Sequence, residues 1–171
     1  MERQINVGKR PKKRKKPVVY IETTIPSYLT SRLSTDLEKY YRQLKTRDWW
    51  EKIFPKIDAV ISDYVLDEAR DGDPVAASRR LEALRGIKIL DKTDEIVTLA
   101  QELQIKLKIP ERAKFDAFHL AFSVVYQVDY VLSWNFEHIV GASVKRTFDD
   151  IGKELSLVMP TLCTPEELME V

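Results

Sequence analysis

The sequence has 171 residues, of which 44% are hydrophobic and 32% are charged, and its net charge at pH 7 is +1. This composition is typical of one globular domain with a sizeable core, and no apolar stretch approaches the roughly 20 residues that cross a bilayer. The single cysteine, Cys163, excludes an intrachain disulfide, so a reducing cytoplasm is the expected location. Because neither C-x-x-C nor H-E-x-x-H occurs, a structural or protease-type zinc site has no support.

The charge is unevenly distributed. Residues 1–17 carry eight Lys and Arg against one Glu, a balance of +7, which leaves −6 for the remainder. Such a dense run of like charges predicts a disordered basic arm before a single domain over 18–171. The arm could contact nucleic-acid phosphates, or it could be a solvated tail or an artefact of where translation is taken to start.

The first part of the domain begins with Val18–Ile21, a β-rich run that predicts a buried parallel strand. Pro26 favours a short helix over 26–31, and a longer helix is expected over 36–54, capped by Thr35 or Asp36. The longer helix has an apolar stripe that indicates a core-facing side more than a base-stacking one: Leu37, Tyr40, Tyr41 and Leu44, extended by Trp49, Trp50, Ile53 and Phe54.

A second strand is predicted over Ala59–Ser62, followed by a helix over 63–70. Turn residues then lead into a helix over 74–85, begun by Pro74, and a third strand follows over Ile87–Leu90.

The second half opens with a helix from Thr93 to about residue 107. The segment 113–127 is apolar nearly all round, which predicts a central helix, and Asp129–Ser133 reads as the fourth strand. Weaker signals predict a helix near 144–155, a short strand near 157–159 or Leu162, and a last short helix from Pro165.

Strands that alternate with helices predict an α/β fold, a three-layer α/β/α sandwich around a mainly parallel sheet. The carboxyl ends of the strands, at 22, 62 and 133–135, should then open on one edge of the sheet, where such folds form their sites.

Four oxygen-bearing side chains follow or lie within these apolar runs: Glu22, Glu68, Asp116 and Asn135. A carboxylate beside an apolar core is costly unless a cation or a donor compensates it. No single helix can assemble residues this far apart, so only the fold could bring them together. Oxygen ligands of this kind suit Mg²⁺ or Mn²⁺, which can activate water for attack on phosphorus.

Several neighbours compete for these roles. Asp67 or Asp63 could face the pocket in place of Glu68, and Asp129 is a further substitute. His119 shares a helix face with Asp116, but on an apolar helix a hydrogen-bonded core histidine is favoured over a ligand. Lys114 and Arg112 could meet a phosphate, although a solvated face is favoured for both.

Four segments resemble, in order, those of a PIN domain, above all the VapC-type proteins of prokaryotic toxin–antitoxin modules: Val19–Thr24, Ile61–Glu68, Asp116–Ala121 and Asp129–Asn135. The resemblance implies a Mg²⁺- or Mn²⁺-dependent ribonuclease that cleaves RNA, with catalytic metal ligands at Glu22, Glu68, Asp116 and Asn135. It further implies hydroxyl residues at Thr24 (or Thr23) and Ser133, which would contact the substrate or support the ligands. A small antitoxin partner and a homodimer are also implied.

Two positions depart from the family pattern, since both usually hold Asp. Glu22 is longer by one methylene, and Asn135 brings an oxygen without a negative charge. The alternative hypothesis is therefore a PIN-like module that binds RNA or protein with impaired catalysis. A phosphatase or nucleotide-binding protein is less favoured, because the sequence lacks G-x-G-x-x-G and G-x-x-x-x-G-K-[ST].

Overall fold

The computed structural model describes residues 16–170, and its strands form one parallel sheet in the order β3-β2-β1-β4-β5. The central strands β1 and β4 pair with Ile21 opposite Leu132. The strands are β1 (Val18–Ile21), β2 (Asp58–Ser62), β3 (Lys88–Leu90), β4 (Tyr130–Leu132) and β5 (Thr161–Cys163).

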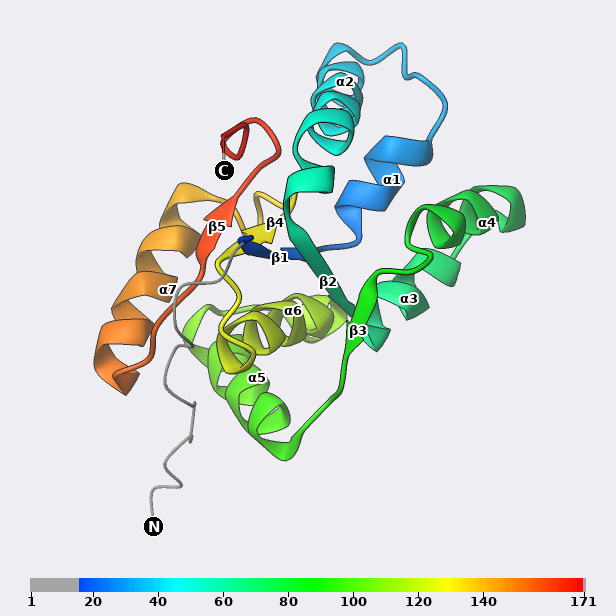
Figure 1. Ribbon diagram of the computed structural model, residues 1–171. Helices are drawn as coiled ribbons and strands as arrows, with labels where there is room; N and C mark the ends of the chain where they lie inside the picture. The colour runs from blue at the N-terminus through cyan, green and yellow to red at the C-terminus, as the bar shows by residue number, and fades with distance from the viewer. Residues whose placement is uncertain (1–15, 171) are drawn as a thin grey trace.

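Helices flank this sheet on both sides. In Figure 1, α1 and α2 lie above β1, whereas α5 and α6 lie below it. This arrangement confirms the α/β fold with a parallel sheet between helical layers. The helices are α1 (Thr24–Thr30), α2 (Leu37–Lys52), α3 (Asp63–Arg70), α4 (Pro74–Ala83), α5 (Asp94–Lys106), α6 (Lys114–Val125) and α7 (Ala142–Leu155), with 3₁₀ turns η1 (Phe54–Lys56) and η2 (Glu111–Ala113).

Side-chain caps fix where three of the helices begin. Asp36 accepts a hydrogen bond from the Lys39 amide at 2.9 Å, and Asp73 accepts one from the Ala76 amide at 2.8 Å, just before Pro74. The Thr93 hydroxyl similarly accepts from the Ile96 amide at 3.4 Å. These contacts satisfy amides that the first helical turn leaves unpaired, and they confirm the predicted starts of α2, α4 and α5.

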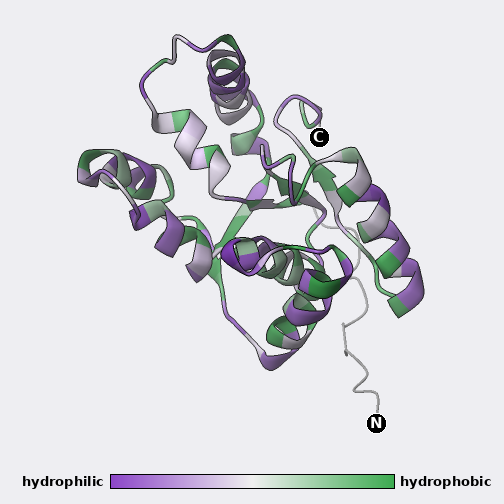
Figure 2. Ribbon diagram, turned by 180° about the vertical axis from the view of Figure 1, so that it is seen from behind, coloured by the Kyte–Doolittle hydropathy of each residue, from purple (hydrophilic) through white to green (hydrophobic). Residues whose placement is uncertain are grey.

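The core lies between the sheet and its helices, with α6 at its centre. Most residues of α6 are buried, including Phe122, Leu120 and Val124, which confirms its predicted central position. Figure 2 shows the same pattern: the strands are largely hydrophobic, whereas the outer helices alternate between polar and apolar residues. Within residues 16–170, no helix combines the length and apolar character that a bilayer crossing requires.

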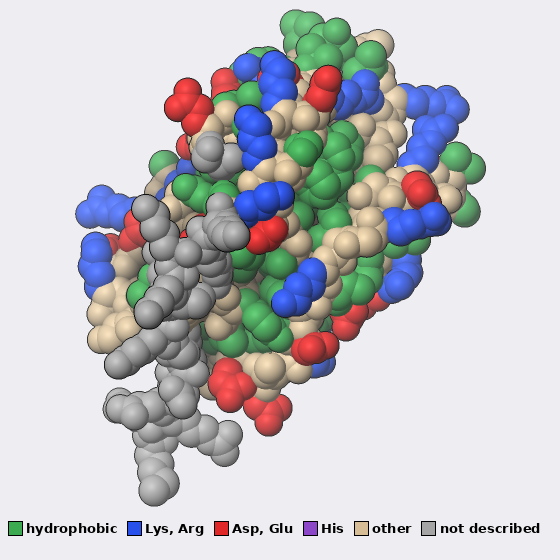
Figure 3. All heavy atoms as spheres, in the orientation of Figure 1, with side chains coloured by type: hydrophobic (Ala, Val, Ile, Leu, Met, Phe, Trp, Pro, Cys, Tyr) green, Lys and Arg blue, Asp and Glu red, His purple; other side chains and the backbone are tan. Residues whose placement is uncertain are grey.

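The prediction for α2 is wrong in the first half of the helix and confirmed at its end. The stripe from Leu37 to Leu44 is exposed, with Leu37 at 83%, whereas Gln43, Thr46 and Trp49 are buried. Gln43 can be buried because its polar groups find partners: its side-chain amide donates to the Ser31 hydroxyl and to the Arg32 carbonyl. Figure 3 shows hydrophobic side chains exposed at the upper end of the molecule, where α2 lies in Figure 1.

The ends of the chain differ from their predictions or lie outside the description. The last strand is Thr161–Cys163, which confirms the predicted alternative near Leu162 and not the one over 157–159. The helix predicted from Pro165 is a turn, although Thr164 and Glu167 form the reciprocal side-chain to backbone bonds of a helix start. Residues 1–15 of the predicted basic arm lie outside the described residues. Lys16, which follows them, donates its amine to the Pro55 carbonyl at 3.2 Å.

Candidate functional site

The register of the two central strands places Glu22 beside Ser133. Ile21 and Leu132 are paired, and the next residue along, Glu22, donates its amide to the Leu132 carbonyl at 3.1 Å. Because β1 and β4 are parallel, the segments that follow them leave the sheet at the same edge. The predicted strand-end site is therefore built at the carboxyl ends of β1 and β4.

The carboxylate of Glu22 is buried, and all of its hydrogen bonds fall on one oxygen. Oε2 accepts from the Thr24 hydroxyl at 2.5 Å, the Thr24 amide at 3.1 Å and the Ser133 hydroxyl at 2.7 Å. Among residues 16–170, no donor reaches Oε1. Neutral donors thus fix the orientation of this carboxylate without neutralising its charge.

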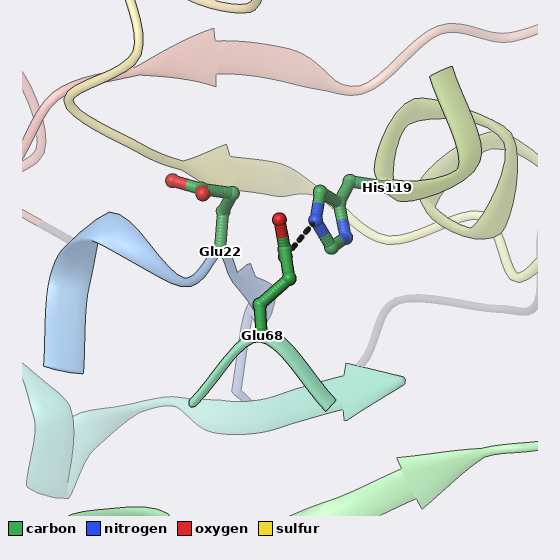
Figure 4. Close-up of side chains that lie close together, drawn as sticks. All are labelled: Glu22, Glu68 and His119. Carbon is green, nitrogen blue, oxygen red and sulfur yellow. Dashed lines mark hydrogen bonds and ion pairs between the residues drawn. The ribbon is translucent and has the colours of Figure 1, made fainter. Parts of the chain in front are cut away.

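The carboxylate of Glu68, on α3, is held by a different set of partners. Its Oε2 accepts from the Thr23 hydroxyl at 2.6 Å and lies 2.8 Å from Nε2 of His119. Figure 4 shows Glu68 and His119 side by side, with Glu22 next to them and its carboxylate directed away from the pair in this view. The alternatives on α3 point elsewhere, since Asp67 pairs with Arg70 at 2.6 Å and Asp63 is exposed.

His119, on α6, is fully buried and bonded through both ring nitrogens. Nε2 meets Glu68, and Nδ1 lies 2.8 Å from the Tyr20 hydroxyl, which in turn lies 2.6 Å from the Ser62 hydroxyl. When the ring is neutral, one proton arrangement satisfies the whole row: Ser62 donates to Tyr20, Tyr20 to Nδ1, and Nε2 to Glu68. The buried, hydrogen-bonded histidine expected from the sequence is therefore also a member of the acidic cluster.

Asp116 and Asn135 form the neighbouring part of the site. The Asn135 side chain is close enough to Asp116 to act on the pKa of that carboxyl, and its Oδ1 accepts the His138 amide at 3.0 Å. Asp116 is largely buried, and it is close enough to His119 and Glu68 for their charges to influence its pKa. The amide oxygen of Asn135 keeps one lone pair for another partner.

The charges in this pocket are strongly coupled. Burial raises the pKa of Glu22 above its usual value, and burial likewise raises the pKa of Asp116. Burial alone would raise the pKa of Glu68 too, but the hydrogen bond and charge of His119 and the bond from Thr23 bring it below the usual value. Burial acts to lower the pKa of His119, yet the hydrogen bond and charge of Glu68, with the charges of Glu22 and Asp116, raise it overall.

The donor set fits a divalent cation. Glu22, Glu68 and His119 each offer one ligand atom, and these atoms lie within 4.8 Å of one another. Within the described residues no donor reaches Oε1 of Glu22, and the cluster holds the acids Glu22, Glu68 and Asp116 against the imidazole of His119, with that of His138 near Asp116. Two carboxylates with an imidazole suit Mn²⁺ and related ions. His119 could ligate only if its bond to Glu68 opened, because Tyr20 occupies its other nitrogen.

The predicted hydroxyl residues contact the carboxylates directly. Thr24 and Ser133 both donate to Glu22, and both oxygens also accept backbone amides, from Trp134 at 2.8 Å and from Asn135 at 2.9 Å. Their positions favour holding Glu22 in place over binding a substrate. Asp129 is not part of the site, since its carboxylate accepts the Val18 amide at the opposite end of β1.

Comparisons with known proteins give limited information. No family model matches the sequence, and no curated protein matches it. Among solved structures, VapBC2 from Rickettsia felis bound to a DNA fragment from the promoter is similar with a TM-score of 0.48 and 14% identity, covering 86% of this chain and 98% of that chain. A similarity at this level establishes neither family membership nor activity.

Proposed function

We propose that this protein is a metal-dependent endoribonuclease that hydrolyses phosphodiester bonds in RNA. The observation that carries the proposal is the convergence of Glu22, Glu68 and His119, with Asp116 beside them, at the carboxyl edge of the parallel sheet. The four segments that resemble a PIN domain supply these residues, and the same resemblance suggests the toxin of a toxin–antitoxin module.

Glu22, Glu68 and Asp116 would hold the ion, Mg²⁺ or Mn²⁺, with Asn135 as a further ligand through its second lone pair. When bound, such an ion supplies charge stabilisation and water activation for hydrolysis at phosphorus. The chain itself orients the ligands: Thr24 and Ser133 fix the carboxylate of Glu22, and Thr23 with His119 fixes that of Glu68. Ligands held in this way lose little entropy on binding the ion.

Cleavage of single-stranded RNA with Mn²⁺ or Mg²⁺ tests the proposal, with Asp116→Asn compared to the unaltered protein. The variant should cleave far more slowly, because it removes a charge and keeps the shape. Asp150→Asn is a matched control, since Asp150 is an exposed acid that pairs with Lys153. Equal rates for the unaltered protein and for Asp116→Asn would reject the assignment.

A binding module with impaired catalysis is the second candidate function. It is favoured by two contacts: His119 already compensates Glu68, and the Asn135 oxygen already accepts the His138 amide. Both contacts engage oxygen atoms that would otherwise be available to ligate an ion. Calorimetric titration with Mn²⁺ separates the two candidates, because the absence of binding at millimolar concentration would favour the module that binds RNA or protein.

A protein partner is also proposed, either a small antitoxin or a second copy of the chain. Its support is the α2 face, which we define as Leu37, Tyr40 and Leu44 and which is exposed. Exposed apolar residues that follow one helix face often bind another protein. Leu37→Glu should lower any self-association seen by sedimentation, whereas unchanged sedimentation of a dimer would place the interface elsewhere.

A further inference from the structure

The turn that follows β4 places an aromatic ring on the surface beside the acidic pocket. Phe136 is 48% exposed, whereas Trp134, two residues earlier, is 4% exposed. The residue between them, Asn135, lies near Asp116, and the Trp134 amide donates to the Thr24 hydroxyl that holds Glu22. Phe136 is therefore one residue away from a member of the pocket.

This ring is supported from below by a cation. The guanidinium carbon of Arg42 lies 5.0 Å from the centroid of the Phe136 ring and 5.6 Å from that of Trp134. Arg42 is itself fixed, because it donates to the Tyr28 hydroxyl at 3.3 Å and pairs with Glu38. A guanidinium within about 6 Å of an aromatic centroid is attracted by the ring. Phe136 therefore has a fixed support on one side and an open surface on the other.

The neighbouring indole makes this support rigid. The Trp134 ring lies 6.4 Å from that of Phe136 and donates its Nε1 proton to the Thr46 hydroxyl at 2.8 Å. Since Thr46 is buried on α2, the turn after β4 is tied to that helix. Phe136 thus stays exposed on a fixed base, although an apolar ring of this size would gain free energy from burial.

We propose that Phe136, backed by Arg42, is a stacking site for an unpaired nucleobase of single-stranded RNA. This inference rests on the proposed function and deepens it by naming a side chain that would bind a base of the substrate. Every nucleobase has a face that can stack on an aromatic ring, and a nearby guanidinium adds attraction for the backbone phosphates. A base stacked here would hold its strand next to the acidic pocket, whereas the bases of a duplex cannot reach the ring.

A binding measurement in EDTA, where no cleavage occurs, tests the site apart from catalysis. The probe is a fluorescein-labelled single-stranded RNA of about 10 nucleotides, a length within the usual range of single-strand sites. Phe136→Ala should weaken binding by about 5- to 150-fold, the range that corresponds to the loss of one base–aromatic stack. Phe136→Trp should restore the affinity, and a duplex of the same sequence should bind alike to both proteins.

The chain offers a matched control for this substitution. Tyr41 is 43% exposed and has a cation over its ring, with the Lys45 amine 5.4 Å from the centroid, but it contacts Glu166 in place of the acidic pocket. Tyr41→Ala should therefore leave the RNA affinity unchanged. An equal loss in both variants would show that the site is not specific, and it would overturn the proposal.

An abasic nucleotide moved along the probe completes the test as a double-mutant cycle. At one position, removal of the base should weaken binding to the unaltered protein but not to Phe136→Ala, because both changes remove the same contact. Additive losses at every position would overturn the stacking site even if the protein cleaves RNA. Unchanged RNA affinity with altered self-association would assign Phe136 to a protein interface, and failure of the unaltered protein both to bind and to cleave RNA would reject the proposed function as well.

Discussion

The two glutamates of the pocket have the same chemistry but opposite environments. Glu22 is buried and receives only neutral donors, so burial raises its pKa. Glu68 is 28% exposed and contacts an imidazole, so its pKa is lowered even though burial opposes this. The comparison teaches that, within residues 16–170, an imidazole contacts Glu68 directly but not Glu22, so that under the proposed function the external cation is needed on the side of Glu22.

The largest effect should come from removing the uncompensated charge. Glu22→Gln keeps an oxygen for Thr24 and Ser133 but loses the charge, so metal-dependent RNA cleavage should fall by about 100- to 1,000-fold. Single-turnover cleavage at saturating Mn²⁺ measures this effect. Glu51→Gln, an exposed acid outside the pocket, is the control and should retain full activity. A loss below threefold for Glu22→Gln would place the ion elsewhere.

The two threonines at the start of α1, Thr23 as its N-cap and Thr24 as its first residue, allow the environments of Glu22 and Glu68 to be compared with one type of substitution. Thr24→Val removes a donor to Glu22 and a partner of the Trp134 amide, so cleavage should fall by about 10- to 30-fold. Thr23→Val removes a donor to Glu68, which His119 still holds, and a loss of about threefold is expected. Titration of activity against Mn²⁺ measures both variants, and a larger loss for Thr23→Val would reverse the comparison.

The positions of Glu22 and Asn135 at one edge of the sheet can be predicted from the sequence, because the ends of their strands can be identified in it. The runs before Glu22 and Asn135 predict two strands, and a parallel sheet brings their carboxyl ends to one edge. The sequence does not distinguish Glu68 from its direct neighbour Asp67. Only the packing of α3 against α6 shows which acid faces Glu22, and it also brings His119 to Glu68 across a long stretch of sequence.

The wrong predictions for the α2 stripe and for a helix from Pro165 have a common physical cause. Apolar spacing on α2 predicts a buried stripe, but burial depends on which side finds partners for its polar groups, and Gln43 and Thr46 find theirs in other segments. Thr164 and Glu167 make the contacts of a helix start, but a single turn of helix is unstable unless further turns follow. Both outcomes depend on tertiary contacts that no local pattern specifies.

In the metal-free protein, neutralising Glu22 and neutralising Glu68 should change the free energy of unfolding in opposite directions. Glu22→Gln removes a buried charge and should raise the free energy of unfolding by about 0.5–2 kcal/mol. Glu68→Gln keeps a hydrogen-bond acceptor for His119 but loses the charge, so stability should fall by about 1 kcal/mol. Urea denaturation in EDTA at pH 7 measures both, and a shift of the same sign in the two variants would contradict the proposed asymmetry.

The smallest predicted effect is the change of stability with pH, and a bound metal ion should reverse the direction of that change. In the metal-free protein the pKa of His119 lies above its usual 6.5, so its stabilising contribution is complete below that pH and is lost as the pH rises through the folded-state pKa. The pKa values of Glu22 and Asp116 are also raised. Their ionisation therefore lowers the stability of the protein as the pH rises above their usual values of about 4.5 and 3.8. Glu68, with a lowered pKa, loses its contribution only as the pH falls below 4.5.

Stability in EDTA should therefore decline between pH 6 and pH 8, as His119 loses its proton in the folded protein. In excess Mn²⁺ it should instead rise over the same range, because protons compete with the metal for the carboxylates. Urea denaturation at both pH values, with and without the ion, measures the two trends. If stability declines equally with and without Mn²⁺, the carboxylates bind no ion, and the charge of Glu22 must be compensated by another partner.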